Sequence, residues 1–151
     1  MSAPAIPDGD SVLFDSVAFA YFLDPNPAYY LRAEELFGRI AAGRITGISS
    51  TLVLTELLVP YYQRGGGNAP ALSATVRSYP KLEWVEVGAS IAERAARLRA
   101  TYNLRTPDAV HVATGLERHA GWFVTNDPRL RRVEREGIRV WLFDELAIPP
   151  T

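Results

Sequence analysis

The sequence predicts an α/β fold of the doubly wound type (α/β/α), in which helices cover both faces of a mainly parallel five-stranded sheet. Two observations predict it: short apolar runs alternate along the chain with longer amphipathic segments, and glycine, proline or capping residues separate them. The 151 residues suffice for the core of one domain but are too few for two ordinary ones. We therefore expect residues 1–151 to form a single domain.

The expected elements follow one another in regular order. Strands are predicted at residues 12–14, 45–48, 82–87, 122–125 and 138–143. Helices are predicted at residues 16–23, 29–42, 52–59, 72–78, 90–100, 106–119 and 128–136, with Pro60 ending or kinking the third helix. Strands that alternate with helices form parallel sheets covered on both faces. Residues 82–87 alternate apolar and polar side chains, which indicates a strand nearer an edge.

The composition excludes several kinds of protein. No apolar run reaches the ~20 residues of a membrane span, and residues 1–11 lack the basic and apolar regions of a secretory signal. The chain contains no cysteine, which excludes disulfides, thiolate zinc sites and cysteine nucleophiles. These features fit a cytoplasmic protein with no membrane attachment.

The charge argues against a protein that binds nucleic acid through overall positive charge, because the formal net charge is −1. Lys81 is the only lysine, so nearly all positive charge is arginine, and several arginines cluster within residues 129–139. A guanidinium group suits phosphate, although a GC-rich genome would produce the same arginine bias.

Four carboxylates are predicted to meet at one edge of the sheet. Asp15 ends the first strand, and Asp127 follows the fourth. Glu56 and Asp108 lie on helices that begin at the same edge. Open α/β sheets bind ligands outside the carboxyl ends of their strands, where the winding direction reverses. If the first strand is central and the fourth lies beside it, all four side chains converge there.

Each acid also has a purely structural explanation. Asp15 and Asp127 are suitable N-caps, and Asp108 suits the first turn of a helix. Glu56 fits such an explanation only if it is exposed at the rim, because no basic residue lies within one helical turn of it. Four clustered acids repel one another unless a cation lies among them. Oxygen ligands without histidine or cysteine select a hard ion, so we expect Mg²⁺ or Mn²⁺.

Four segments resemble the motifs of a known family. They are residues 13–16 (Leu-Phe-Asp-Ser), 54–57 (Leu-Thr-Glu-Leu), 106–114 (Thr-Pro-Asp-Ala-Val-His-Val-Ala-Thr) and 123–130 (Phe-Val-Thr-Asn-Asp-Pro-Arg-Leu). In order and spacing they resemble the four motifs of PIN domains over nearly the whole chain. The small size and the run at residues 108–114 most resemble VapC-type toxins of bacterial and archaeal toxin–antitoxin pairs. The chain departs from the family in its aromatic stretch after Ser16 and its glycine insert at residues 65–68.

The resemblance implies an endoribonuclease that hydrolyses RNA phosphodiester bonds with Mg²⁺ or Mn²⁺, forms a homodimer and is inhibited by a small antitoxin protein. It assigns the catalytic and metal-binding roles to Asp15, Glu56, Asp108 and Asp127. In a two-metal mechanism, Asp15 would be the central ligand, and Glu56 and Asp108 would complete the first site. Asp127 would serve the second site or orient water. We expect residues 59–80 to contribute to the dimer interface.

Four further residues are candidates for contacting the substrate or supporting the acids: Ser16, Arg105, His111 and Thr125. Arg105 is the best single candidate for a phosphate contact. His111 lies one turn after Asp108, and we favour a packed or supporting role for it over contact with substrate. Thr125 is the polar second member of the fourth motif.

Two alternatives compete with this interpretation. One is a catalytically silent PIN-fold module that only binds protein or RNA, and the presence of all four acids argues against it. The other is a different doubly wound protein, such as an aspartyl-phosphate phosphatase or a receiver domain. Those folds need a second acid two residues after the first-strand aspartate, or an acidic pair just before it, plus a basic residue at a later strand end. Here position 17 is valine, and Lys81 precedes a strand.

Overall fold

The central sheet has five strands, and every neighbouring pair is parallel. The computed structural model describes residues 6–24 and 26–146. Within it the strands are β1 (Ser11–Phe14), β2 (Thr46–Ser50), β3 (Leu82–Val85), β4 (Trp122–Thr125) and β5 (Arg139–Leu142), in the order β3-β2-β1-β4-β5. The predicted doubly wound fold is confirmed. The first strand is central and the fourth lies beside it, which is the condition under which the four acids can converge. The strand near residue 82 is at an edge, as predicted.

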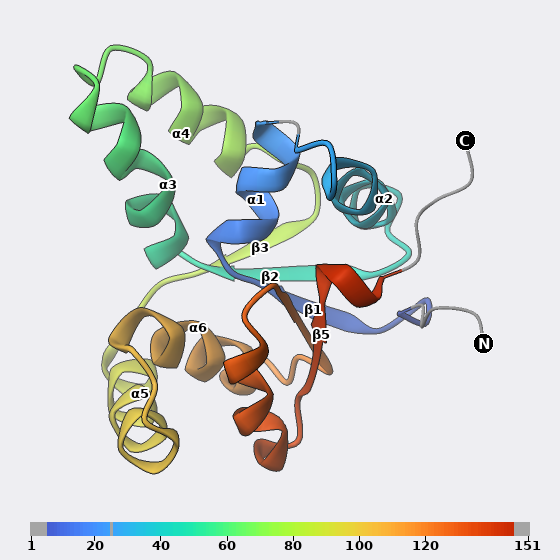
Figure 1. The fold of residues 1–151 in the computed structure, drawn as a ribbon, viewed down its shortest axis with the longest axis vertical. Helices are drawn as coiled ribbons and strands as arrows, with labels where there is room; N and C mark the ends of the chain where they lie inside the picture. Colours follow the sequence, from blue (N-terminus) through green and yellow to red (C-terminus); the bar gives the residue numbers. More distant parts are fainter. Residues whose placement is uncertain (1–5, 25, 147–151) are drawn as a thin grey trace.

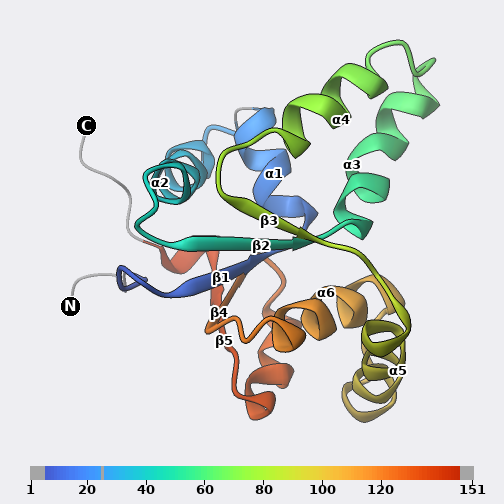
Figure 2. The same cartoon turned by 180° about the vertical axis from the view of Figure 1, so that it is seen from behind.

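Helices cover both faces of the sheet (Figure 1). One face carries α1 (Ser16–Leu23), α2 (Tyr30–Ala41), α3 (Leu52–Gln63) and α4 (Ala69–Arg77). The other carries α5 (Ala89–Tyr102), α6 (Thr106–Glu117) and the 3-10 helix η1 (Pro128–Glu136). A short 3-10 turn, η2 (Phe143–Glu145), follows β5. Seen from behind in Figure 2, α3 and α4 form a hairpin that extends beyond the sheet.

Three helices differ from their predicted form. α3 continues to Gln63 with Pro60 inside it, instead of ending at residue 59. Proline removes one backbone hydrogen bond, but Leu57 and Leu72 pack against the core from α3 and α4, and this packing outweighs the loss. α4 begins at the fully buried Ala69 instead of residue 72. Residues 128–136 form a 3-10 helix and not an α-helix.

The side chains of β1 enter two separate cores. Val12 and Phe14 pack among the residues of α1 and α2, whereas Leu13 packs among those of α5 and α6. All three side chains are completely buried, as expected for the central strand of a sheet covered on both faces. Asp15 is the first polar residue after this run, so it marks the point where the chain leaves the sheet.

Helix α6 packs unusually close to β1. A Cβ atom at Gly115 would stand 2.8 Å from Leu13 Cδ2, well inside the contact distance of two carbon atoms. Glycine at this position therefore permits the close approach. The approach also sets the distance between the amino-terminal half of α6, which carries Asp108 and His111, and the carboxyl end of β1.

Among the described residues, no helix is both long and apolar enough to cross a membrane. The first five positions, on which the expected absence of a secretory signal partly rests, lie outside the described residues.

Gly115→Ala is expected to lower the free energy of unfolding by about 1–3 kcal/mol, because the new methyl group overlaps the buried Leu13 side chain. The matched control is Gly38→Ala in α2, where nothing lies within 4 Å of the added Cβ atom. The control should gain about 0.5–1 kcal/mol, the preference of a helix for alanine over glycine. Urea denaturation measures both values, and equal stabilisation by the two substitutions would contradict the close packing of α6 on β1.

Candidate metal centre

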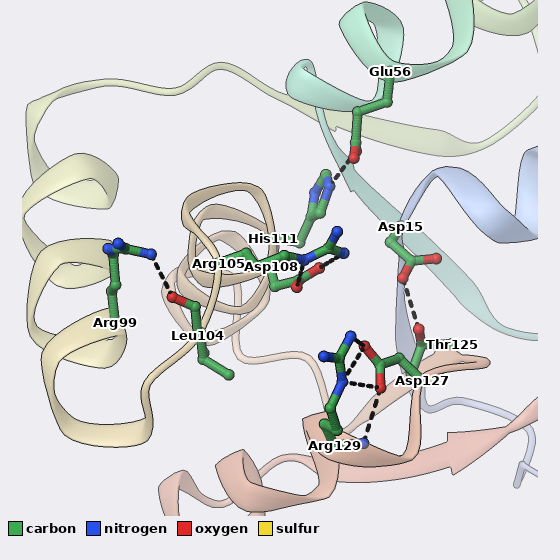
Figure 3. A network of polar contacts seen from close by, with 10 residues as sticks. All are labelled: Asp15, Glu56, Arg99, Leu104, Arg105, Asp108, His111, Thr125, Asp127 and Arg129. Atoms are coloured by element: carbon green, nitrogen blue, oxygen red, sulfur yellow. Dashed lines mark hydrogen bonds and ion pairs between the residues drawn. The ribbon is translucent and has the colours of Figure 1, made fainter.

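A cavity of about 310 Å³ lies at the carboxyl edge of the sheet. The sequence-predicted carboxylates that line it are Asp15, Glu56, Asp108 and Asp127. The other predicted site residues also line it: Ser16, Arg105, His111 and Thr125. Figure 3 shows most of these side chains from close by. The structure thus brings every residue of the predicted site to one place.

Local structure fixes three of the acids where the sheet ends. Asp15 is the N-cap of α1, and its Oδ1 accepts a hydrogen bond from the Val17 N–H at 3.1 Å. Asp127 is the N-cap of η1 and accepts from the Arg129 N–H at 3.0 Å. Asp108 stands in the first turn of α6. Capping therefore does not compete with a role at the cavity for Asp15 and Asp127, because it holds these two carboxylates at the cavity wall.

Asp15 is the most deeply buried of the four acids, with 8% of its surface exposed. The Thr125 hydroxyl donates to Asp15 Oδ2 at 2.7 Å. Burial raises the pKa of Asp15 from 3.8 to about 6, against the lowering effects of His111 and of the hydrogen bonds from Thr125 and Val17. The charge of Glu56 adds to the increase. Asp15 is therefore a carboxylate whose ionised form is poorly compensated by its protein surroundings.

Glu56 has a partner on a different helix. His111 Nε2 lies 2.5 Å from Glu56 Oε1, and the imidazole ring is almost completely buried. This contact joins α3 to α6 and explains how the carboxylate is tolerated without a basic neighbour on its own helix. The other ring nitrogen, Nδ1, is buried without a hydrogen-bond partner in the described part of the chain. His111 thus supports Glu56 from inside the protein.

Asp108 and Asp127 are each paired with an arginine. Arg105 Nε donates to Asp108 Oδ2 at 3.0 Å. Arg129 donates from Nη2 to Asp127 Oδ2 at 2.8 Å and from Nε to Asp127 Oδ1 at 3.0 Å. The Arg129 guanidinium holds the pKa of Asp127 below its ordinary value of 3.8. Arg105, predicted as a phosphate contact, therefore contacts a carboxylate of the cavity in this structure.

Sequence reasoning missed three residues at this site. Arg129 belongs to the arginine cluster at residues 129–139, and its place two residues after Asp127 is the sequence signal that could identify it. Asn126 lines the cavity and donates to the Tyr21 hydroxyl at 2.9 Å. Asn126 stands inside the fourth motif and could have been considered. Nothing in the sequence distinguishes Tyr21 from the other aromatic residues near it.

The donor set of the cavity fits a hard divalent cation. Its four acids supply only oxygen, and they outnumber the two guanidinium groups that pair with them, which leaves an excess of negative charge. In residues 6–24 and 26–146 no three histidine or acidic side chains stand close enough together to hold an ion as they are. Asp108 and Asp127 instead have arginine partners, and Glu56 has His111. To hold one ion, the acids would have to come closer together, and Asp108 and Asp127 would have to give up part of their contacts with Arg105 and Arg129.

Comparisons with known proteins agree with this architecture. The model of the PIN domain family matches residues 12–136. No curated protein sequence matches the chain. A solved structure of VapBC2 from Rickettsia felis, bound to a DNA fragment from its promoter, contains a chain of 17% identity with a TM-score of 0.66, covering 87% of this chain and 98% of that chain.

Two further structures are similar. VapC20 of Mycobacterium tuberculosis, a Sarcin-Ricin loop cleaving toxin, has 18% identity and a TM-score of 0.63, covering 78% of this chain and 90% of that chain. A toxin-antitoxin complex from Klebsiella pneumoniae contains a chain of 17% identity with a TM-score of 0.56, covering 78% of this chain and 87% of that chain. At these identities the similarity is one of fold.

Asp15→Asn is expected to stabilise the metal-free protein near neutral pH by about 3 kcal/mol, the free-energy equivalent of the pKa increase from 3.8 to about 6. Because the folded protein binds this proton more tightly than the unfolded chain, wild-type stability falls as the pH rises from about 4 to about 6. The amide removes that loss, so the difference between variant and wild type should vanish towards about pH 4. Thermal melts in chelator across this range measure it.

Asp127→Asn is the control, and its expected effect on the stability of the protein has the opposite sign. Arg129 lowers the pKa of Asp127 below 3.8, so this ion pair stabilises the fold above that pH and its contribution is lost as the pH falls. The amide should therefore destabilise the protein near neutral pH. A loss of stability in Asp15→Asn under the same conditions would contradict the assignment of Asp15 as an uncompensated buried charge.

Proposed function

The chain belongs to the PIN domain family, and on this premise we propose that it is a metal-dependent endoribonuclease, the toxin of a toxin–antitoxin pair. The observation that carries the proposal is the convergence of Asp15, Glu56, Asp108 and Asp127 on one cavity at the carboxyl edge of β1 and β4. Carboxylate oxygens favour Mg²⁺ or Mn²⁺. The fold shared with VapC20, a Sarcin-Ricin loop cleaving toxin, supports RNA as the substrate.

The residues of the cavity would hold the ion and orient the phosphodiester. When bound, a divalent cation stabilises the negative charge that develops on phosphate oxygens and makes the attacking water more acidic. Asp15 is the rigid member of the ligand set, because Val17 and Thr125 fix its two oxygens and leave each one a free lone pair. Glu56 is fixed through Oε1 by His111, so its Oε2 is free to act as a ligand.

The raised pKa of Asp15 links metal binding to pH. With a pKa of about 6, Asp15 is mostly ionised at neutral pH and can act as a ligand there. Below about pH 6 a proton competes for the same carboxylate, so metal affinity and activity should both fall.

Two protein partners complete the proposal. The first is a cognate antitoxin, supported by the similar fold of a chain in the toxin-antitoxin complex from Klebsiella pneumoniae. The second is another copy of this chain. Val59 and Tyr62 are exposed large apolar residues on α3, in the hairpin that extends beyond the sheet (Figure 1). Such a surface favours a homodimer formed through residues 59–80.

RNA cleavage is expected in Mg²⁺ or Mn²⁺ and should be abolished by EDTA. Asp15→Asn and Glu56→Gln should each reduce the rate by on the order of a hundredfold or more, because each removes one charge from the ligand set. The control is Asp144→Asn, which changes an exposed aspartate outside the cavity that accepts a hydrogen bond from Tyr29. Gel assays of single-stranded RNA measure the rates. RNA binding without cleavage in either metal would instead identify a catalytically silent binding module.

Tyr62→Asp is expected to convert the homodimer to a monomer, because it places a charge in the apolar contact surface of α3. Leu31→Asp is the matched control, since Leu31 is a similarly exposed apolar residue on α2, outside the proposed interface. Light scattering at micromolar protein concentration measures the mass of each variant. A monomeric wild-type protein would contradict the proposed dimer.

A further inference from the structure

Arg105, which lines the cavity, and Arg129, which pairs with Asp127 at the cavity wall, contact the carboxylate oxygens that a metal ion would need. Arg129 contacts both carboxylate oxygens of Asp127. Arg105 contacts Asp108 in the same way, with Nε 3.0 Å from Oδ2 and Nη2 3.5 Å from Oδ1. If Asp108 and Asp127 serve as ligands, which rests on the proposed function, their guanidinium partners must give up at least part of these contacts.

The exposed fractions of the side chains indicate that the arginines, and not the aspartates, are free to rotate away. The side chains of Arg105 and Arg129 are 70% and 64% exposed, whereas those of Asp108 and Asp127 are 13% and 24% exposed. Asp127 is also fixed by its capping bond from the Arg129 N–H. The two aspartates are therefore more confined than their partners, and the long arginine side chains can rotate away through solvent.

The ion pairs of Arg105 and Arg129 lie near each other at the same edge of the sheet. Arg105, Asp108 and Asp127 line the same cavity, and Arg129 is bonded to Asp127, so the two ion pairs lie close to each other. The backbone just before Arg105 is held in place, because Arg99 Nη1 donates to the Leu104 carbonyl at 2.7 Å. Figure 3 shows this contact beside the two ion pairs. Rotation of Arg105 would thus leave its Cα atom fixed at the edge of the cavity.

We propose that Arg105 and Arg129 exchange partners during the reaction: they neutralise Asp108 and Asp127 in the metal-free protein, and they bind RNA phosphates once the cation has taken those carboxylates. The four carboxylates of the cavity and the two guanidinium groups that pair with Asp108 and Asp127 together carry a formal charge of −2, which one divalent cation would neutralise. The released guanidinium groups then face an anionic substrate whose geometry suits their paired donors. The same two residues therefore compete with metal and recruit RNA.

This exchange predicts effects of opposite sign on two ligands. In the absence of RNA, Arg105→Gln and Arg129→Gln should each bind Mn²⁺ about three- to fivefold more tightly, since a competing ion pair is removed. Each variant should bind a fluorescein-labelled oligouridylate about tenfold more weakly in Ca²⁺. The slope of log affinity against log salt concentration should fall by about 0.7 for each arginine, the signature of one lost phosphate contact. Electron paramagnetic resonance measures Mn²⁺ binding, and fluorescence anisotropy measures RNA binding.

Arg131→Gln is the matched control. It removes one arginine from the same helix η1, but Arg131 pairs with Glu145, which does not line the cavity, whereas Arg129 pairs with Asp127, which does. This variant should bind Mn²⁺ as the wild type does and keep the full salt dependence of RNA binding. If a glutamine variant fails to fold, Arg105→Met or Arg129→Met replaces it, because methionine keeps much of the apolar stem but cannot contact phosphate, so the salt slope should fall by the same amount.

The possible results of these experiments distinguish a failure of the partner exchange from a failure of the proposed function. Weaker binding of both Mn²⁺ and RNA would show that the arginines only support the structure, and an unchanged salt slope would show that they do not contact phosphate. Either result overturns the exchange even if the wild type cleaves RNA. A wild-type protein that neither binds Mn²⁺ nor cleaves RNA overturns the proposed function and the exchange together.

Discussion

The arrangement of the whole site depends on the burial of one carboxylate at the end of the central strand. β1 is completely apolar and completely buried from Val12 to Phe14, so the next residue, Asp15, enters the cavity deep below the surface. Two hydrogen-bond donors fix its oxygens, yet the loss of hydration still dominates and raises the pKa to about 6. A buried carboxylate with this balance favours either a proton or a cation.

The other acids differ from Asp15 because each has a partner of its own. Glu56 has His111, Asp108 has Arg105, and Asp127 has Arg129. The two arginines offset part of the negative charge of the four carboxylates, and His111 supplies a hydrogen-bond partner to Glu56. The free-energy cost of burying a charge therefore falls mainly on Asp15. The other three acids are held in ion pairs or hydrogen bonds at the cavity. Local destabilisation of this kind is typical of functional sites in otherwise stable proteins.

Sequence reasoning predicted the parts of this arrangement that follow from chain order. Parallel strands end at one edge, so residues that follow β1 and β4 must lie near each other, and Asp15 and Asp127 were predicted to do so. Features that depend on contacts between residues far apart in the sequence could not be predicted in this way. The partner of Glu56 is 55 positions away, and no pattern within one helix could identify it. The continuation of α3 through Pro60 likewise depends on packing against the core and not on local propensity.

Asp15 is a buried carboxylate whose ionised form a bound cation would stabilise, and its pKa shows this most directly. Carbon-detected NMR of the ¹³C-labelled protein can follow the Asp15 carboxyl carbon through a pH titration, first in chelator and then with saturating Mg²⁺. The account predicts a pKa of about 6 in chelator and a value well below 3.8 with Mg²⁺, because the bound ion stabilises the ionised form. An ordinary pKa in chelator, or a raised pKa that Mg²⁺ leaves unchanged, would contradict it.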